Sequence, residues 1–81
     1  MRTKGIIEGL QILQRYRDDE DGFDCGAEHD VFYAYATDRP VEASDIARLI
    51  EIGWFQEVSY GDDDKFSAKH YDPEEAWAAF T

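Results

Sequence analysis

Carboxylates crowd three short stretches of this chain, and carboxylates are the side chains that bind metal cations and basic protein surfaces. The first stretch is Asp18-Asp19-Glu20-Asp21, the second holds Asp24, Glu28 and Asp30, and the third is Asp62-Asp63-Asp64. Carboxylates on a rigid scaffold can occupy the Lys and Arg sites with which a protein holds DNA phosphates. These ten residues are therefore predicted to bind a basic partner.

Calcium is the first alternative ligand for the first stretch. If Gly22 stood at position 6 of an EF-hand loop, Asp19 and Asp21 would stand at positions 3 and 5 and Glu28 at position 12. Position 1 would then be Arg17, a cation where calcium needs an oxygen ligand. The run is better explained as a solvated turn, and no calcium is expected.

Zinc binding and nucleophilic catalysis are the other chemistries to weigh. Cys25, His29 and His70 lack the paired short spacing of a closed zinc site. Cys25, His29 and Asp30 contain the residue types of a nucleophilic triad, but a single strand cannot bring Cys25 within about 3 Å of His29. We therefore expect no metal, no cofactor and no enzymatic activity.

The charge is distributed unevenly along the chain. The 81 residues hold 19 Asp and Glu against 8 Lys and Arg, a net charge of −11. Residues 1–17 carry four basic side chains and one acid, a net of +3, so residues 18–81 carry −14. Such a surface repels nucleic-acid backbone and anionic lipid, so neither is an expected direct partner. Self-repulsion on this scale is consistent with a basic protein partner.

Length and composition predict one folded domain over residues 1–81. Hydrophobic residues make up 43% and aromatic residues 15%, which is too much for a disordered acidic tail. No apolar run approaches the roughly 20 residues of a membrane span, and Glu8 and two glutamines interrupt any signal-peptide region. A single cysteine fits a reducing cytosol, so the expected location is cytoplasmic. The chain is expected to be a monomer or a dimer.

The first expected element is an amphipathic helix over residues 4–17. Its apolar stripe follows helical spacing and consists of Ile6, Ile7, Leu10 and Leu13. Gly9 near the edge of this stripe predicts a close approach of the helix to a sheet, and Ile12 is expected to point away from the stripe as a contact residue. Arg15 and Arg17 suit the negative end of the helix dipole.

The remaining pattern predicts strands and a second helix. Residues 23–35 alternate as one long strand, on which Asp24, Glu28 and Asp30 would line the outer face about 6.5–7 Å apart. A second helix is expected to begin near Ser44 and to end at Gly53, and residues 54–60 are expected to form a strand. Residues 73–81 fit either a helix or a final strand. Most aromatic side chains are expected in the core, with a minority exposed.

Four segments resemble a family of small acidic proteins of phages and prophages: Gly5–Leu13, Ala27–Ala34, Asp45–Phe55 and Trp77–Thr81. The resemblance leaves out residues 60–73, which would be an insertion between two hairpin-forming segments. It implies the element order α-β-α-β-β, a strand at the tail, and no catalytic residues. Small acidic phage proteins include anti-CRISPR proteins and other DNA mimics, which are similar to this chain in size and charge.

The sequence thus predicts an α+β domain, with a small antiparallel sheet of about three strands packed with two helices. Its expected function is that of a phage-encoded acidic protein in the host bacterial cytosol. It would inhibit a nucleic-acid-binding defence complex, such as a CRISPR effector complex, by competing for the DNA-binding site. The alternative is a non-enzymatic adaptor or structural module of a phage, which would bind through Phe32, Trp54 or Tyr60.

Overall fold

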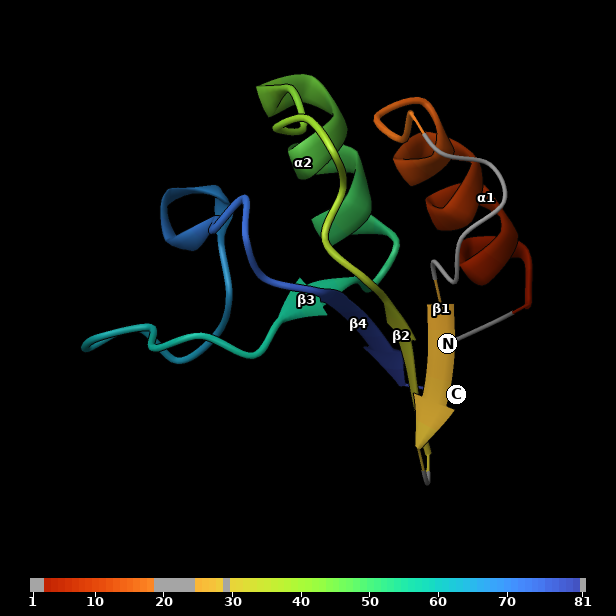
Figure 1. Cartoon of the computed structure of the whole chain (residues 1–81). Helices are drawn as coiled ribbons and strands as arrows, with labels where there is room; N and C mark the ends of the chain where they lie inside the picture. Colours follow the sequence, from red (N-terminus) through yellow and green to blue (C-terminus); the bar gives the residue numbers. More distant parts are fainter. Residues whose placement is uncertain (1–2, 19–24, 29, 81) are drawn as a thin grey trace.

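The computed structural model describes residues 3–18, 25–28 and 30–80. Two helices and one antiparallel four-stranded sheet confirm the expected α+β class, with one strand more than expected (Figure 1). The sheet order is β1-β2-β4-β3, so the C-terminal strand lies inside the sheet. In chain order the elements are α1 (Thr3–Gln14), β1 (Cys25–Glu28), β2 (Val31–Ala34), α2 (Ala43–Glu51), β3 (Phe55–Gln56), the 3-10 helix η1 (Ala68–His70) and β4 (Trp77–Phe80).

The single strand predicted over residues 23–35 is wrong, because a hairpin occupies this stretch. β1 and β2 pair antiparallel in the register Cys25↔Ala34 to Glu28↔Val31, which leaves two residues between them. A two-residue connection also changes which alternate positions face the core: Cys25 shares a face with Ala34, not with the odd-numbered residues of β2. The alternation of residue types over residues 23–35 could not show that the chain turns back between β1 and β2.

The tail is a strand, and its alternative assignment as a helix is wrong. β4 pairs with β2 from Val31↔Phe80 to Ala34↔Trp77 and with β3 through Phe55↔Ala78 and Gln56↔Trp77. The small side chains of Ala78 and Ala79 are fully buried, as an interior strand requires. The strand expected over residues 54–60 is much shorter, because only Phe55–Gln56 pair with β4.

α1 confirms the first predicted helix but presents a different face to the core. Ile12, expected to point outward, is 6% exposed, whereas Ile7, expected in the stripe, is 51% exposed. The cause is Gly9: an added Cβ there would lie 2.1 Å from Nε1 of Trp54, so the indole fills the space above the glycine. The predicted close approach at Gly9 is confirmed, with the Trp54 ring as the contacting group.

α2 confirms the second predicted helix and its C-terminal glycine. Gly53 follows the helix with φ 102°, a conformation that favours glycine, and its N–H donates to Ile50 O at 3.1 Å. The helix begins before Ser44, which therefore lies in the first turn. The residue that precedes the helix is Glu42, whose side chain makes no capping hydrogen bond.

The core lies between the helices and the inner face of the sheet. Its apolar members are Ile12, Leu13, Ala34, Val41, Ile46, Leu49, Trp54, Phe66, Trp77 and Ala79. Most aromatic side chains contribute to it, as expected, while Tyr35 and Phe80 remain exposed. One polar residue, Gln56, is also fully buried in the described part of the chain.

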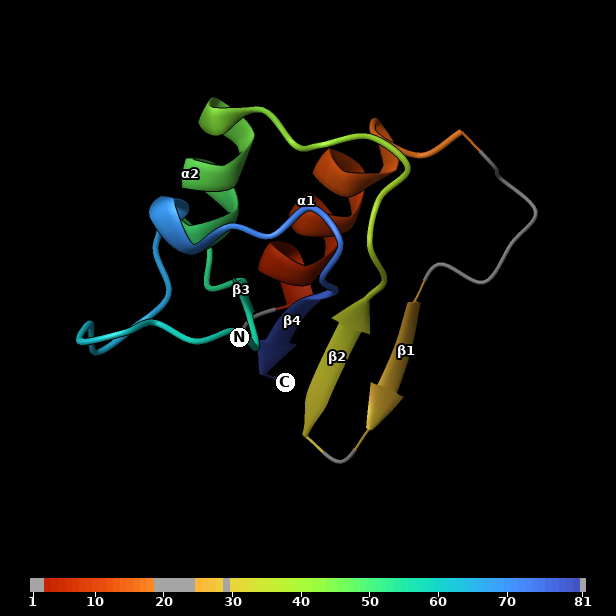
Figure 2. The ribbon, with the colours of Figure 1, turned by 60° about the vertical axis from the view of Figure 1, so that its left-hand side comes forward.

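The two helices lie side by side, and the β1–β2 hairpin extends beyond them (Figures 1 and 2). The loop between β3 and η1 projects on the side of the molecule opposite α1 in Figure 1 and on the side opposite β1 in Figure 2. Neither helix of the described chain has the length and apolar character needed to cross a membrane.

Candidate functional site

The structure separates the predicted acidic residues into different places. Asp18 follows α1, whereas Asp62, Asp63 and Asp64 lie in the loop between β3 and η1. This loop lies far from the C-terminal end of α1 in both ribbon views (Figures 1 and 2). Asp18 and the third acidic stretch therefore do not form one continuous surface. The other residues of the first stretch, 19–21, and Asp24 lie outside the described residues.

The predicted carboxylate row on one strand face is wrong. Asp30 lies in the hairpin connection between β1 and β2, and Glu28 is the last residue of β1. The third member, Asp24, lies outside the described residues. Because the strand ends before Asp30, these three residues cannot repeat at the spacing of alternate strand positions.

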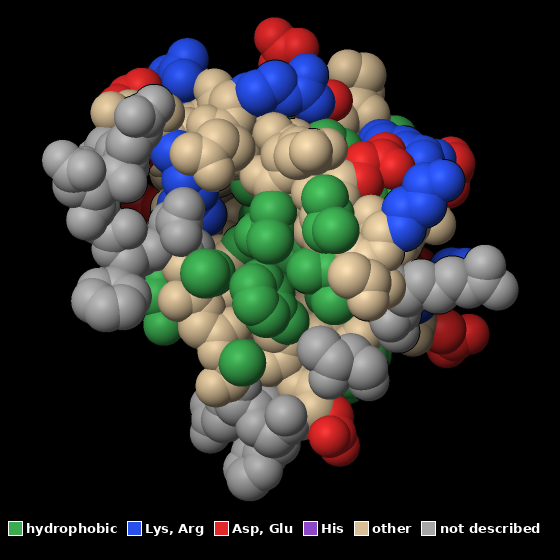
Figure 3. Space-filling view, turned by 90° about the vertical axis from the view of Figure 1, so that its right-hand side faces the viewer, with side chains coloured by type: hydrophobic (Ala, Val, Ile, Leu, Met, Phe, Trp, Pro, Cys, Tyr) green, Lys and Arg blue, Asp and Glu red, His purple; other side chains and the backbone are tan. Residues whose placement is uncertain are grey.

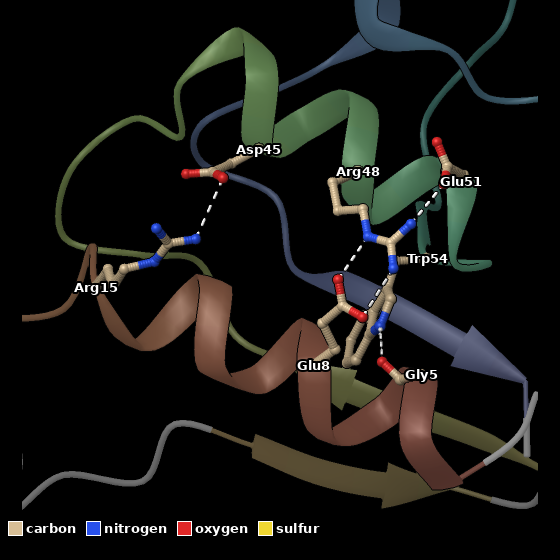
Figure 4. Close-up of polar contacts among 7 residues, drawn as sticks. All are labelled: Gly5, Glu8, Arg15, Asp45, Arg48, Glu51 and Trp54. Carbon is tan, nitrogen blue, oxygen red and sulfur yellow. Dashed lines mark hydrogen bonds and ion pairs between the residues drawn. The ribbon is translucent and has the colours of Figure 1, made fainter.

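Arg48 contacts two carboxylates: Glu8, 40 residues earlier on α1, and Glu51, three residues later on α2 (Figure 4). Its Nε and Nη2 donate to the two oxygens of Glu8 at 2.5 and 2.9 Å, and its Nη1 donates to Glu51 at 2.5 Å. The hydrogen bond from Arg48 lowers the pKa of Glu8, and the same pair raises the pKa of Arg48. This bidentate contact ties α1 to α2 and neutralises part of the acidic charge.

A second neutralised carboxylate is Asp45, in the first turn of α2. Arg15 pairs with it at 3.2 Å, and the hydroxyl of Tyr16 donates to its other oxygen. Burial and this hydrogen bond raise the pKa of Tyr16. The helix predicted to reach residue 17 ends at Gln14, so Arg15 lies outside the last helical turn, where it was expected, and instead links the segment after α1 to the start of α2.

The segment after β2 closes the C-terminal end of α1. The backbone N–H groups of Asp38 and Arg39 both donate to Tyr16 O, at 3.1 and 3.2 Å. The Arg39 side chain donates to Arg15 O at 2.8 Å and pairs with Asp18 at 3.2 Å. Asp18 is therefore a partly neutralised residue at a helix end.

His70 organises the loop that carries Asp62–Asp64. Its Nδ1 accepts the backbone N–H of Ser67 at 2.9 Å, so its Nε2 carries the proton that Asp63 accepts at 2.8 Å. Asp63 also pairs with Lys69 at 2.9 Å, and these two contacts, with Lys69 the larger cause, lower its pKa. Asp63 is thus an internal contact of the loop, while Asp62 and Asp64 face solvent.

Ser67, His70 and Asp63 have the residue types of a nucleophile, a base and an acid, a set that the sequence analysis missed. Ser67 Oγ lies 3.1 Å from His70 Nδ1. The lone pair of that nitrogen already accepts the Ser67 backbone N–H, in the capping box of η1. The geometry therefore serves to hold the loop. In the described chain no three His, Cys, Asp or Glu side chains lie close enough together to hold a metal ion.

Among the described residues, the 57–75 segment contains the largest uncompensated acidic group, and the sequence had predicted only three of its seven acids as partner-binding residues. Its acids are Glu57, Asp62, Asp63, Asp64, Asp72, Glu74 and Glu75. Against these seven it holds only Lys65 and Lys69, so its net charge is −5 with histidine neutral. Of these carboxylates, Asp63 alone makes an ion pair in the described structure.

Buried Gln56 fixes the position of this segment. Its Nε2 donates to Asp72 O at 2.8 Å and to Glu75 O at 3.0 Å, and its Oε1 accepts the Asp72 N–H at 2.9 Å. The Tyr60 hydroxyl donates to Gln56 O at 3.0 Å. The acidic turn at residues 72–75 and the loop after β3 are therefore both fastened to the same residue of β3.

Comparison with protein families, curated proteins and solved structures found no match. The resemblance to small acidic phage proteins therefore stays a prediction, and function has to be argued from this chain alone.

Proposed function

We propose that this protein is a non-catalytic acidic inhibitor that occupies the DNA-binding site of a host defence complex. The leading instance is a phage-encoded inhibitor of a CRISPR effector complex in the bacterial cytosol. The observation that carries the proposal is the negative charge left after internal pairing. Glu8 and Asp45 pair across the two helices and Glu51 pairs with Arg48 within α2, yet the 57–75 segment keeps a net charge of −5.

The linear density of charge supports competition with DNA. The molecule is 39 Å in its longest dimension and carries a net charge of −11, which is about one charge per 3.5 Å. One strand of duplex DNA carries about one charge per 3.4 Å of helix axis. A channel lined with Lys and Arg would therefore be exposed to a negative charge density comparable with that of one DNA strand.

The charge is not spread over every face. On the face drawn in Figure 3, hydrophobic side chains gather at the centre, and charged side chains of both signs lie around its upper edge. A contact with a basic channel would therefore use particular acidic segments. The 57–75 segment is the candidate that the described structure supports best.

Inhibition of DNA binding by acidic-residue variants tests this proposal. The first variant, Asp62→Asn, Asp64→Asn, Glu74→Gln and Glu75→Gln, removes four unpaired charges and leaves a net charge of −7. At about 0.2–1 kcal/mol for each of the four exposed charge contacts, we expect about 4- to 900-fold weaker inhibition. Fluorescence anisotropy of labelled target DNA bound to purified CRISPR effector complexes would measure it.

The matched control variant has the same net charge. This control also has a net charge of −7, but its 57–75 segment is unchanged. It combines Asp18→Asn, Asp19→Asn, Glu20→Gln and Asp21→Asn. We expect a smaller loss of inhibition from this control. Equal losses would show that only total charge matters, and no inhibition by the unmodified protein at low salt, with any effector tested, would contradict the proposal.

An adaptor or structural module of a phage is the second candidate, because two aromatic side chains are exposed. Phe80 is 59% exposed and Tyr35 is 47% exposed. Trp54, expected as an adaptor contact, is 1% exposed and contributes to the core, so its replacement would report on folding. For this candidate, Phe80→Ser should abolish partner binding while the 57–75 charge variant leaves it unchanged.

A further inference from the structure

Two neighbouring hollows share Phe80 in their linings. The first has a volume of about 510 Å³ and the second about 460 Å³, both within the usual range of ligand pockets. Gly53 and Phe80 line both of them. The first is completed by Lys4, Gly5, Glu8, Arg48 and Ile52, several of which Figure 4 shows at the α1–α2 contact. The second is completed by Ile50, Trp54, Phe55, Tyr60, Asp64, Lys65 and Phe66.

The hollows exist because the chain leaves the edge of β4 at Gly53. β3 pairs with β4 only through Phe55 and Gln56, so no strand continues beside Phe80 on that side. The N–H groups of Gly53 and Trp54 donate back to α2 instead, to Ile50 O and Leu49 O. Among the described residues, Phe80 has one aromatic neighbour, Phe55, whose ring centroid lies 5.0 Å away, and the Phe80 ring stays accessible.

The linings of the two hollows contain lysine side chains that no described carboxylate pairs with, although the protein as a whole is strongly acidic. Neither Lys4 nor Lys65 makes an ion pair in the described structure, although the charge of Lys4 helps to lower the pKa of Glu8. Lys4 lines the first hollow and Lys65 lines the second. Arg48 also lines the first hollow but is already paired with Glu8 and Glu51, so the unpaired charges of the lining are Lys4 and Lys65 against Asp64, while the whole chain carries −11.

We propose that the groove formed by these two hollows binds a peptide segment that has apolar side chains flanked by carboxylates. The apolar side chains would lie on either side of Phe80, and the carboxylates would meet the ammonium groups of Lys4 and Lys65. The partner is thus opposite in charge to the one that the 57–75 segment would bind. The inference gives a ligand chemistry to the adaptor candidate and does not depend on competition with DNA.

Charge complementarity selects this occupant over two others. A basic peptide would place its charges beside the ammonium groups of Lys4 and Lys65, and a second copy of the chain would bring another net charge of −11. Repulsion between the whole protein and an anionic peptide acts at long range. At about 0.15 M salt the Debye length is about 8 Å, so contact with the lining is screened less than this repulsion.

Three short peptides that differ only in charge test the proposal: acetyl-Glu-Leu-Phe-Glu-amide and its Gln and Lys counterparts. Binding would be followed by backbone amide shifts of the ¹⁵N-labelled full chain at about 0.15 M salt. We expect saturable shifts centred on Gly53 and Phe80. The Glu peptide should bind at least about threefold more tightly than the Gln peptide, because two exposed ion pairs are gained.

Variants of equal net charge locate the site. The first double variant combines Lys4→Gln and Lys65→Gln and removes the two groove lysines. The second combines Gln11→Glu and Gln14→Glu and leaves them in place. Both variants have a net charge of −13. The first variant should abolish the preference for the Glu peptide, and the second should keep it. Phe80→Ser should abolish binding, whereas Ile7→Ser, at the exposed Ile7 outside the groove, should not.

Equal or tighter binding of the Lys peptide would overturn the proposal, as would shifts that map away from Gly53 and Phe80. Shifts that depend on protein concentration without peptide would identify a second copy as the occupant and would also overturn it. Because the probes contain no DNA or effector complex, failure here is distinguishable from failure of the proposed inhibition.

Discussion

Replacing Gly9 by alanine should destabilise the protein, although alanine is the better helix former. In an α-helix this change alone would add about 1 kcal/mol of stability. Here the added Cβ would lie 2.1 Å from Nε1 and 2.3 Å from Cε2 of Trp54, far inside van der Waals contact. The indole is 1% exposed and therefore has little room to move.

The magnitude follows from what the displaced indole would lose. Overpacking costs about 1–3 kcal/mol. Separation of the Trp54 Nε1–H from Gly5 O, now 3.1 Å apart, would leave a buried donor without an acceptor at a cost of about 1–3 kcal/mol. After subtracting the helix gain, we expect Gly9→Ala to lower the free energy of unfolding by about 3 kcal/mol. For a domain of this size that is about 12–24 °C in Tm.

Urea denaturation followed by tryptophan fluorescence and circular dichroism would measure this change. Ala47→Gly, at an exposed position inside α2, is the control that gives the size of the propensity effect alone, about 1 kcal/mol. In a Trp54→Phe background the cost of Gly9→Ala should fall by at least about 1 kcal/mol, because the clashing atoms are gone. A Gly9→Ala protein as stable as the unmodified one would refute the reasoning.

Three further predictions concern polar contacts. Gln56→Leu should lower the free energy of unfolding by about 2–4 kcal/mol in urea denaturation, because three backbone groups of the acidic turn lose their partners. Arg48 holds the pKa of Glu8 below its unfolded value of 4.5, so this stabilisation is complete above pH 4.5 and is lost as pH falls through the folded pKa. Glu8→Gln should therefore flatten the dependence of unfolding free energy on pH below 4.5. Tyr16 has a pKa raised above 10.0, so its stabilisation is complete below pH 10.0 and is lost as pH rises through the folded pKa; Tyr16→Phe should remove this alkaline loss.

Elements with strong local signals could be predicted from the sequence. Helical spacing of apolar residues located both helices, and Gly53 marked the end of the second one. The β1–β2 turn could not be predicted in the same way. Its two connecting positions, His29 and Asp30, lack the Asn-Gly or Asp-Gly pair that signals a tight hairpin.

Contacts between distant residues explain the other differences. The orientation of α1 depends on Trp54, which donates a hydrogen bond to Gly5 O, 49 residues earlier. The spacing of apolar residues within α1 cannot predict such a long-range contact. Arg48 likewise reaches Glu8 across 40 residues. Counting carboxylates therefore gave the correct net charge but could not distinguish internally paired acids from unpaired ones. The acids of residues 72–75 were missed because buried Gln56, which positions their turn, has no sequence signature.

Mutual exclusion is the most direct test of the proposed inhibition. The affinity of the protein for a purified CRISPR effector complex would be measured with and without increasing concentrations of target DNA, at about 50 mM and about 300 mM salt. Competition for one site predicts that the apparent Kd rises in proportion to the DNA concentration, and that high salt weakens binding. An apparent Kd that stays constant as DNA saturates the complex would contradict the claim that the acidic surface takes the place of DNA.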